Sequence, residues 1–266
     1  MIADPLLLCA DIGNSRTVVG LVRDGEVLAH WAVQTDERRT ADEWGLLLEG
    51  LLDRAIATCP DAAAPAGIAL CATVPSVLHE WREMLATYHA TSTHVVVEPG
   101  IRTGVPILMD NPREVGADRI VNALAASRLY DGPTVVVDFG TATTFDVVSA
   151  QGQYVGGAIA PGIEISLEAL GLRGAQLRKV ELARPRSVIA KNTVEALQSG
   201  VLFGVASQVD GIVMRMADEL GVDLDDLHVV ATGGLADLVV EECRTVTDHR
   251  PLLTLLGLEM IFHRNV

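Results

Sequence analysis

Two segments of the chain combine residue types that suit the binding of phosphate groups. They read Asp11-Ile12-Gly13-Asn14-Ser15-Arg16-Thr17-Val18 and Asp138-Phe139-Gly140-Thr141-Ala142-Thr143-Thr144-Phe145. Glycine beside short hydroxyl and amide side chains lets backbone N–H groups approach an anion closely. An aspartate just before it suits a hard cation such as Mg²⁺, which prefers oxygen ligands. Two such loops could hold the phosphates of a nucleotide together with their metal ion.

The two segments occupy equivalent places in the predicted secondary structure. Each follows an apolar run expected to be a strand and precedes another, so each is predicted at the tip of a hairpin. One such segment alone is often a plain turn, in which aspartate and glycine are common. Asp11 and Asp138 lie 127 positions apart (138 − 11) in a chain of 266 residues, and this repetition favours a duplicated architecture.

A third glycine-containing segment follows a later strand. It reads Ala231-Thr232-Gly233-Gly234-Leu235-Ala236. Glycines at this place would let an adenosine lie against the backbone, although a tight strand-to-helix connection without a ligand would use the same residues.

The elements around these segments follow from hydrophobic periodicity and from start and stop signals. Asp24-Gly25 predicts a hairpin turn, and capping boxes predict helices that begin after Thr40 and after Asn192. The irregular stretch 99–112 marks a domain boundary, which gives predicted domains 1–113 and 114–266. Strands are expected at 6–10, 17–22, 26–33, 66–72, 94–97, 134–137, 143–148, 154–160 and 228–231, and helices at 76–88, 118–130 and 254–266.

The segment from Asn111 to Arg119 has the pattern of a short helical turn followed by a longer helix. Gly116 ends the turn, and the longer helix is expected to start near Asp118. Because a helix N-terminus carries partial positive charge, this position is expected to keep Asp118 ionised. Its alternative role is that of a plain N-cap.

Composition excludes several classes of partner. Twenty basic and 35 acidic residues give a net charge of −15, which argues against nucleic acid or anionic lipid bound through a basic surface. No uninterrupted apolar run approaches the ~18 residues of a spanning helix. The four cysteines form no C-x-x-C pair, the seven histidines show no metal-ligand spacing, and there is no P-loop motif. We therefore expect a cytoplasmic protein without nucleic-acid or membrane partners.

Taken together, these segments resemble the sugar kinase, heat-shock protein and actin superfamily, and within it the type III pantothenate kinase family. The resemblance implies an α/β fold of two duplicated ribonuclease-H-like (actin-like ATPase) domains with an ATP cleft between them. It implies ATP-dependent phosphorylation of pantothenate to 4′-phosphopantothenate, the first step of coenzyme A biosynthesis, by a homodimer. The residues that carry it are Asp11–Val18, Asn111–Arg119, Asp138–Thr143, Gly156–Gly162, Lys191–Thr193 and Leu255–Leu258.

The resemblance also implies roles for individual residues. Asp118 would accept the proton of the pantothenate hydroxyl, and Asp138 would bind a monovalent cation, K⁺ or NH₄⁺. Asp11 is expected to bind Mg²⁺, and Arg119 either binds the substrate carboxylate or pairs with Glu114 or Asp118. ATP contacts would come from Asp11, Ile12, Gly13, Asn14, Ser15, Arg16, Thr17, Val18 and Thr141, and substrate contacts from Met109, Gly116, Ala117, Asp118, Arg119 and Thr193.

The chain departs from the family pattern at Met109, where many members have a tyrosine that touches the substrate. A thioether cannot donate the hydrogen bond that a tyrosine hydroxyl donates. This departure supports one alternative, a catalytically weak relative with an accessory or regulatory role. A kinase of the same superfamily that acts on another small alcohol is a further alternative.

Overall fold

The computed structural model describes residues 5–58, 64–173 and 180–266, and these form two compact units. Unit 1 comprises Met1–Val105, Asn111–Ala125 and Leu252–Val266, and unit 2 comprises Pro106–Asp110 and Ala126–Pro251. The predicted division into 1–113 and 114–266 differs from these units, because the start of the helix α3 (Ala117–Leu129) and the C-terminal helix α6 (Leu253–Asn265) belong to unit 1.

Unit 1 is built on a five-stranded sheet of order β3-β2-β1-β4-β5. Its strands are β1 (Leu7–Ile12), β2 (Arg16–Arg23), β3 (Glu26–Gln34), β4 (Gly67–Ala72) and β5 (Thr93–Val96). β1, β2 and β3 form an antiparallel meander, whereas β4 runs parallel to β1 and β5 parallel to β4. The predicted turn between β2 and β3 is confirmed, since Asp24 and Gly25 both have positive φ, at 55° and 75°.

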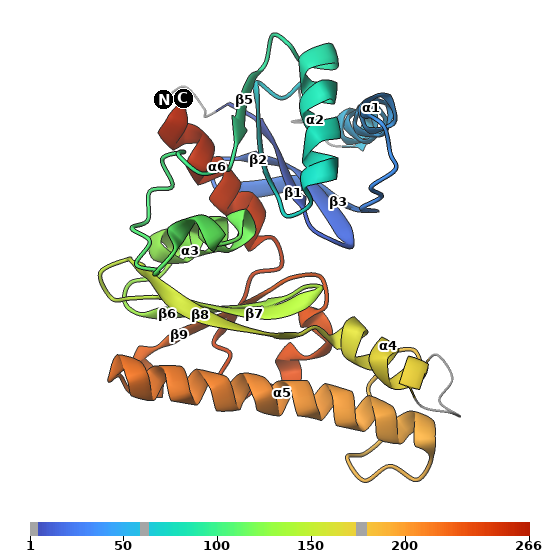
Figure 1. The fold of residues 1–266 in the computed structure, drawn as a ribbon, viewed down its shortest axis with the longest axis vertical. Helices are drawn as coiled ribbons and strands as arrows, with labels where there is room; N and C mark the ends of the chain where they lie inside the picture. Colours follow the sequence, from blue (N-terminus) through green and yellow to red (C-terminus); the bar gives the residue numbers. More distant parts are fainter. Residues whose placement is uncertain (1–4, 59–63, 174–179) are drawn as a thin grey trace. The chain divides into compact units, whose positions relative to one another are not determined.

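Helices cover both faces of this sheet. α1 (Ala41–Thr58) and α2 (Pro75–Tyr88) pack on one face, and α6 packs on the other (Figure 1). Alternation along β1 directs Leu8, Ala10 and Ile12 into the core under α1 and α2, so Cys9 and Asp11 point to the face that α6 covers. The capping box before α1 is confirmed: the Glu43 amide donates to Thr40 Oγ1 (3.4 Å) and the Thr40 amide to Glu43 Oε2 (2.8 Å).

Unit 2 repeats the same sheet. Its strands have the order β10-β9-β6-β7-β8, with β6, β7 and β8 antiparallel and β9 and β10 parallel to β6 and to each other. Their bounds are β6 (Thr134–Phe139), β7 (Ala142–Val148), β8 (Tyr154–Pro161), β9 (His228–Thr232) and β10 (Asp248–His249). Because β1 to β5 correspond one by one to β6 to β10, the predicted duplication is confirmed.

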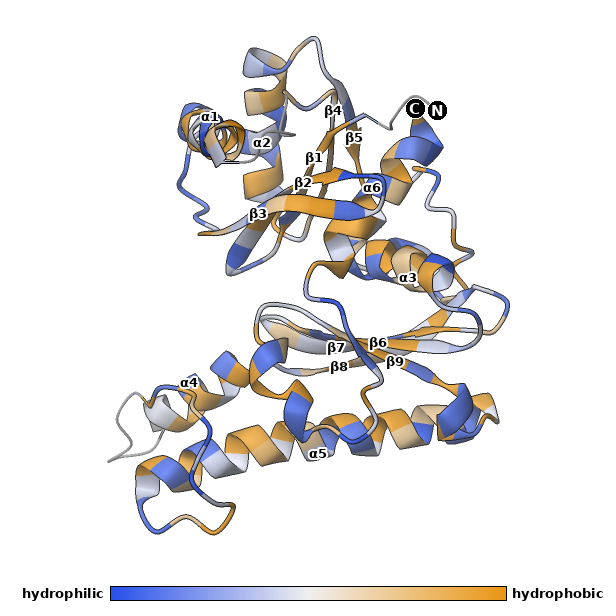
Figure 2. Cartoon of the chain, turned by 180° about the vertical axis from the view of Figure 1, so that it is seen from behind, coloured by the Kyte–Doolittle hydropathy of each residue, from blue (hydrophilic) through white to orange (hydrophobic). Residues whose placement is uncertain are grey.

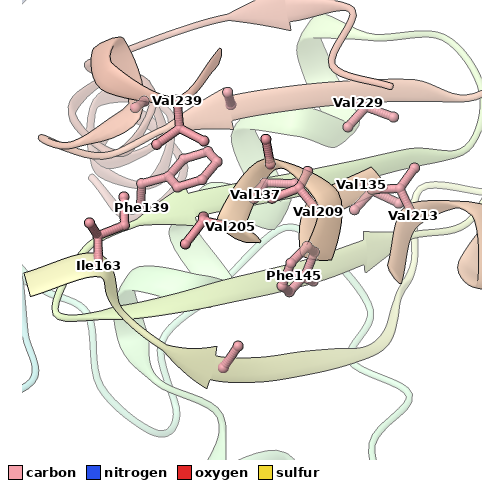
Figure 3. Close-up of a cluster of buried hydrophobic side chains, with 14 of the residues drawn as sticks. Val135, Val137, Phe139, Phe145, Ile163, Val205, Val209, Val213, Val229 and Val239 are labelled. Atoms are coloured by element: carbon pink, nitrogen blue, oxygen red, sulfur yellow. The ribbon is translucent and has the colours of Figure 1, made fainter. Parts of the chain in front are cut away.

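The core of unit 2 lies between its sheet and the helix α5 (Thr193–Leu220), which begins at the predicted cap Asn192. Val205, Val209 and Val213 of α5 pack with Val137 and Phe145 of the sheet (Figure 3). Hydrophobic residues recur along the whole of α5, interleaved with polar ones (Figure 2). Among the described residues α5 alone has the length and composition to cross a membrane, and its buried valines are those of a core helix.

Sequence reasoning missed several elements. The helix α4 (Ile163–Arg173) follows directly on β8, and β10 has only two residues. Short 3-10 helices lie at Pro112–Glu114 (η1), Leu224–Asp226 (η2), Ala236–Leu238 (η3) and Val240–Glu242 (η4). The first of these is the predicted turn before α3.

Candidate active site

The segment Asp11–Val18, which we call the first phosphate loop after its predicted role, spans the tip of the β1–β2 hairpin, as predicted. Asn14, Ser15 and Arg16 are exposed there, whereas Ile12 and Thr17 are fully buried. The Gly13 amide closes the turn by donating to the Arg16 carbonyl at 3.0 Å. The side chains of residues 14–16 are therefore accessible to a ligand, whereas Ile12 belongs to the hydrophobic core.

Asp11 lies at the end of β1, beside a residue that sequence reasoning did not single out for the site. It pairs with Cys71 of the parallel strand β4, and the Cys71 thiol donates to Asp11 Oδ1 at 3.4 Å. Cys71 is fully buried, as expected for this thiol and for Cys9; Cys59 lies outside the described residues. Asp11 itself is partly buried.

Asp118 is the second residue of α3, at its predicted place near the helix N-terminus. Gly116 lies directly against it, since a Cβ at position 116 would fall 2.5 Å from Asp118 Oδ1 and 3.7 Å from the stem of Arg119. Glycine at 116 is thus what lets the carboxylate fold back over the start of the helix. Gly116, Ala117, Asp118 and Arg119, the predicted substrate contacts of this segment, are all partly exposed.

The two candidate carboxylates of unit 1, Asp11 and Asp118, both have raised pKa values. Burial and, to a smaller extent, the nearby charge of Asp118 raise the pKa of Asp11 from 3.8 to about 7, against a smaller lowering by the hydrogen bond from the Cys71 thiol. Burial also raises the pKa of Asp118, because it outweighs the lowering by the Arg119 amide, the Arg119 guanidinium and the Asp118 amide. The amides of the helix N-terminus thus lower the pKa of Asp118, as expected, but desolvation is the larger effect.

The raised pKa of Asp11 predicts a pH-dependent penalty on folding. Between pH ~4 and ~7 the folded chain keeps a proton that the unfolded chain releases, so the stability contributed by Asp11 falls as the pH rises through this window. At 1.36 kcal/mol per pKa unit, the ionised carboxylate costs at most about 4 kcal/mol above pH 7. We expect Asp11→Asn to unfold at a higher temperature than the wild type in metal-free buffer, with a larger difference at pH 8 than at pH 5.

Thermal unfolding at the two pH values measures this difference. Asp53→Asn, at an exposed position on α1, is the matched control and should leave the melting temperature unchanged at both. A melting temperature of Asp11→Asn equal to or below that of the wild type at pH 8 would contradict the assigned pKa shift.

Two glycines of unit 2 lie close to the tip of the β6–β7 hairpin, which contains Asp138–Phe145 and which we call the second phosphate loop. A Cβ on Gly162, which follows β8, would fall 2.1 Å from the Thr141 carbonyl oxygen. Gly233, which follows β9 with a φ of +92°, would place a Cβ 2.4 Å from Asp138 Oδ1. The predicted adenosine segment and the predicted cation ligand Asp138 are therefore neighbours.

The two hairpins differ by one residue in register. Asp11 pairs with Val18 in the first, whereas Asp138 pairs with Thr144 in the second. The residue after each aspartate therefore pairs with a buried threonine: Ile12 pairs with Thr17, and Phe139 pairs with Thr143. The ungapped match of the two sequence segments thus holds up to the glycine and slips by one position after it.

The remaining predicted substrate contacts lie in unit 2. Met109 is partly buried, with its sulfur 3.8 Å from the place a Cβ on Gly156 would take. Thr193 is exposed at the first turn of α5, directly after the cap, where the Asn192 side chain accepts from the Glu195 amide at 2.9 Å. The hydroxyl of Thr193 is thus presented at a helix N-terminus.

Each unit has an aspartate, Asp11 or Asp138, whose carboxylate oxygens could bind a cation. Within the described residues, no three His, Cys, Asp or Glu side chains are grouped so that they could hold a metal ion by themselves. A cation at Asp11 or Asp138 would therefore complete its shell with phosphate, water or backbone oxygens. Asp11 and Asp118 are partly buried carboxylates with raised pKa values. A cation bound nearby would stabilise their ionised forms.

The chain shares its fold with solved proteins of low sequence identity, which include a kinase. A solved ethanolamine utilization protein EutJ from Carboxydothermus hydrogenoformans matches with a TM-score of 0.55 and 17% identity, covering 97% of this chain and 90% of that one. An inorganic polyphosphate/ATP-glucomannokinase from Arthrobacter sp. strain KM matches with a TM-score of 0.53 and 14% identity, covering 98% and 100%. Likeness at this level of identity establishes the shared architecture.

Sequence comparison is more specific. The family model of type III pantothenate kinase matches residues 7–215. A type III pantothenate kinase from Nocardioides sp. (strain ATCC BAA-499 / JS614) is 69% identical over 260 residues, which cover 97% of this chain and 99% of that protein. The chain belongs to the type III pantothenate kinase family.

Proposed function

We propose that this chain transfers the γ-phosphoryl group of ATP to pantothenate and so forms 4′-phosphopantothenate, the first step of coenzyme A biosynthesis. Family membership over nearly the whole chain supports the reaction. The observation that carries the site is the carboxylate of Asp118, which Gly116 allows to fold over the start of α3, near Asp11. The residue types needed for an alcohol-phosphorylating enzyme are thus present in the two duplicated units.

Asp118 acts on the acceptor hydroxyl. Its raised pKa makes its carboxylate a stronger proton acceptor than an ordinary aspartate, closer to the range in which general bases work best. Phosphoryl transfer passes through a loose transition state, so orientation of the hydroxyl by Asp118 matters at least as much as its basicity. Arg119, the next residue of α3, binds the pantothenate carboxylate through its guanidinium group.

The cations have separate holders in this proposal. Mg²⁺ would neutralise phosphate charge when bound. It fits Asp11 because burial and the charge of Asp118 destabilise the ionised form of that carboxylate, which a bound cation would stabilise. A monovalent cation, K⁺ or NH₄⁺, fits Asp138, beside which Gly233 leaves space that any side chain would fill. Thr141, Asn14 and Ser15 serve the phosphates, and Met109 and Thr193 lie along the pantothenate.

A homodimer in the cytoplasm is the proposed working form. Large hydrophobic side chains gather near the N-terminal end of α5, where Val188, Ile189 and Val194 are 64%, 84% and 49% exposed. Exposed apolar residues this close together are typical of a surface that another subunit covers.

ATP turnover in the presence and absence of pantothenate tests this function. We expect turnover that requires pantothenate and Mg²⁺ and that falls severalfold when Na⁺ replaces K⁺, because the cation proposed for Asp138 is K⁺ or NH₄⁺. Pantothenate-independent turnover, or none in K⁺ buffer, would contradict the proposal and favour the accessory role. Stimulation by another small alcohol alone would redirect the assignment to a different acceptor.

A further inference from the structure

Thr35 follows the end of β3, far in sequence from the first phosphate loop, yet it makes two hydrogen bonds to that loop. Its hydroxyl donates to the Gly13 carbonyl at 2.8 Å, and its amide donates to the Ser15 carbonyl at 3.1 Å. A third contact joins its hydroxyl to that of Thr17, also at 2.8 Å. One residue thus holds alternate carbonyls of a loop whose intervening residue, Asn14, is exposed.

The direction of the hydrogen bonds in this cluster can be assigned. A hydroxyl has one proton to donate, and the proton of Thr35 goes to the Gly13 carbonyl. Thr17 must therefore be the donor to Thr35 Oγ1. Because Thr17 is fully buried and its proton is used in this way, it acts as support for Thr35 and its hydroxyl does not reach a nucleotide.

Peptide geometry connects these bonds to anion binding. The C=O and N–H of a trans peptide point in opposite directions, and the described chain has no cis peptide bond. With the Gly13 carbonyl held on Thr35, the N–H of Asn14 in the same peptide must point away from Thr35. Thr17 and Thr35 lie on the α1 side of the sheet, so this N–H is directed toward the side on which Asp11 projects.

The second hairpin has a related arrangement at the equivalent place. Gly162 follows β8 as Thr35 follows β3, since Gln34 pairs with Arg16 and Pro161 with Ala142. There the backbone at Gly162 approaches the loop so closely that a Cβ would fall 2.7 Å from the Gly140 carbonyl oxygen. In both units the residue after the third strand thus contacts the carbonyls of the phosphate loop.

We propose that Thr35 is a positioning residue for ATP: its hydroxyl holds the Gly13–Asn14 peptide so that the Asn14 amide faces the phosphates. The inference rests on the proposed function only in the identity of the nucleotide. Thr35→Val removes the hydroxyl with little change in volume, whereas Thr35→Ser retains it. Thr103→Val is the matched control, because the Thr103 hydroxyl bonds the Val105 carbonyl (3.0 Å) away from this loop.

Binding and kinetics of these variants decide the question. For Thr35→Val we expect the Kd of the non-hydrolysable analogue AMPPNP with Mg²⁺, measured by calorimetry, to rise about three- to tenfold, the range expected when the hydrogen bond that holds the Gly13–Asn14 peptide is lost. The KM for ATP should rise in parallel and the KM for pantothenate stay within twofold. Thr35→Ser should restore both values to near those of the wild type, and Thr103→Val should leave them unchanged.

Two results would overturn the inference. One is a Thr35→Val protein, folded as judged by its melting temperature, that binds AMPPNP as tightly as the wild type. The other is a Thr35→Ser protein as weak as Thr35→Val, which would assign the effect to packing of the methyl group. A wild-type chain that binds AMPPNP without phosphorylating pantothenate would contradict the proposed function alone, and the ratio of Kd values would still decide the role of Thr35.

Discussion

Asp118→Asn is expected to lower kcat by about 10²–10⁴-fold, the range that positioned acid–base help contributes. The substitution keeps the shape of the side chain and its place at the start of α3 but removes the proton acceptor. The proposed nucleotide contacts come from other residues, so AMPPNP binding measured by calorimetry should remain within about threefold of the wild type. Steady-state turnover with saturating ATP and pantothenate measures the loss.

A neighbouring carboxylate supplies the control for this experiment. Glu114→Gln in η1 makes the same chemical change at an exposed position four residues earlier, and it should retain most of the activity. Removing the charge of Asp118 should also lower the pKa of Asp11, because that charge is one of the causes of its rise. Turnover of Asp118→Asn within a few fold of the wild type would rule out Asp118 as the proton acceptor.

Gly233→Ala is expected to destabilise unit 2 and to abolish most turnover. The new Cβ would fall 2.4 Å from Asp138 Oδ1 and 2.7 Å from the Phe139 amide nitrogen, so either β9 or the second phosphate loop must move. A non-glycine residue at a φ of +92° adds backbone strain. Together these effects should cost roughly 2–5 kcal/mol of unfolding free energy, measured by denaturant titration.

Gly221→Ala is the control that separates the backbone strain of a positive φ from the steric clash of the new Cβ with neighbouring atoms. Gly221 also has a positive φ, +69°, but a Cβ there meets no atom within 4 Å. This control should lose only about 1–2 kcal/mol and keep its activity. If Gly233→Ala is no less stable than Gly221→Ala and turns over normally, the contact between the glycine segment and Asp138 does not shape the site.

The features that sequence predicted well are those that neighbouring residues determine. Asp24-Gly25 adopts the two positive φ angles of its turn, and the cap residues Thr40 and Asn192 make the expected bonds to residues three positions later. The position of Asp118 at the start of a helix was correct for the same reason. Each of these outcomes depends on fewer than five consecutive residues.

The features that sequence missed depend on residues far apart in the chain. The pKa of Asp118 rises because the fold removes solvent, an effect that a local argument from the helix N-terminus omits. Cys71 reaches Asp11 only because β4 lies parallel to β1, 60 positions later. β10 is too short and polar to be recognised as a strand, and pairing with β9 defines it. The role of Thr35 likewise required the register of β2 against β3.

The packing of α6 has a consequence for the order in which the two units can finish folding during translation. Its residues close one face of the first sheet, with Phe262 against Gly67 and Leu255 against Gly20, although they follow all of unit 2 in the sequence. During translation that face of the first strands, including Cys9 and Asp11, therefore stays uncovered until α6 has emerged from the ribosome. Every element of unit 2 has emerged by then, so completion of unit 1 comes last.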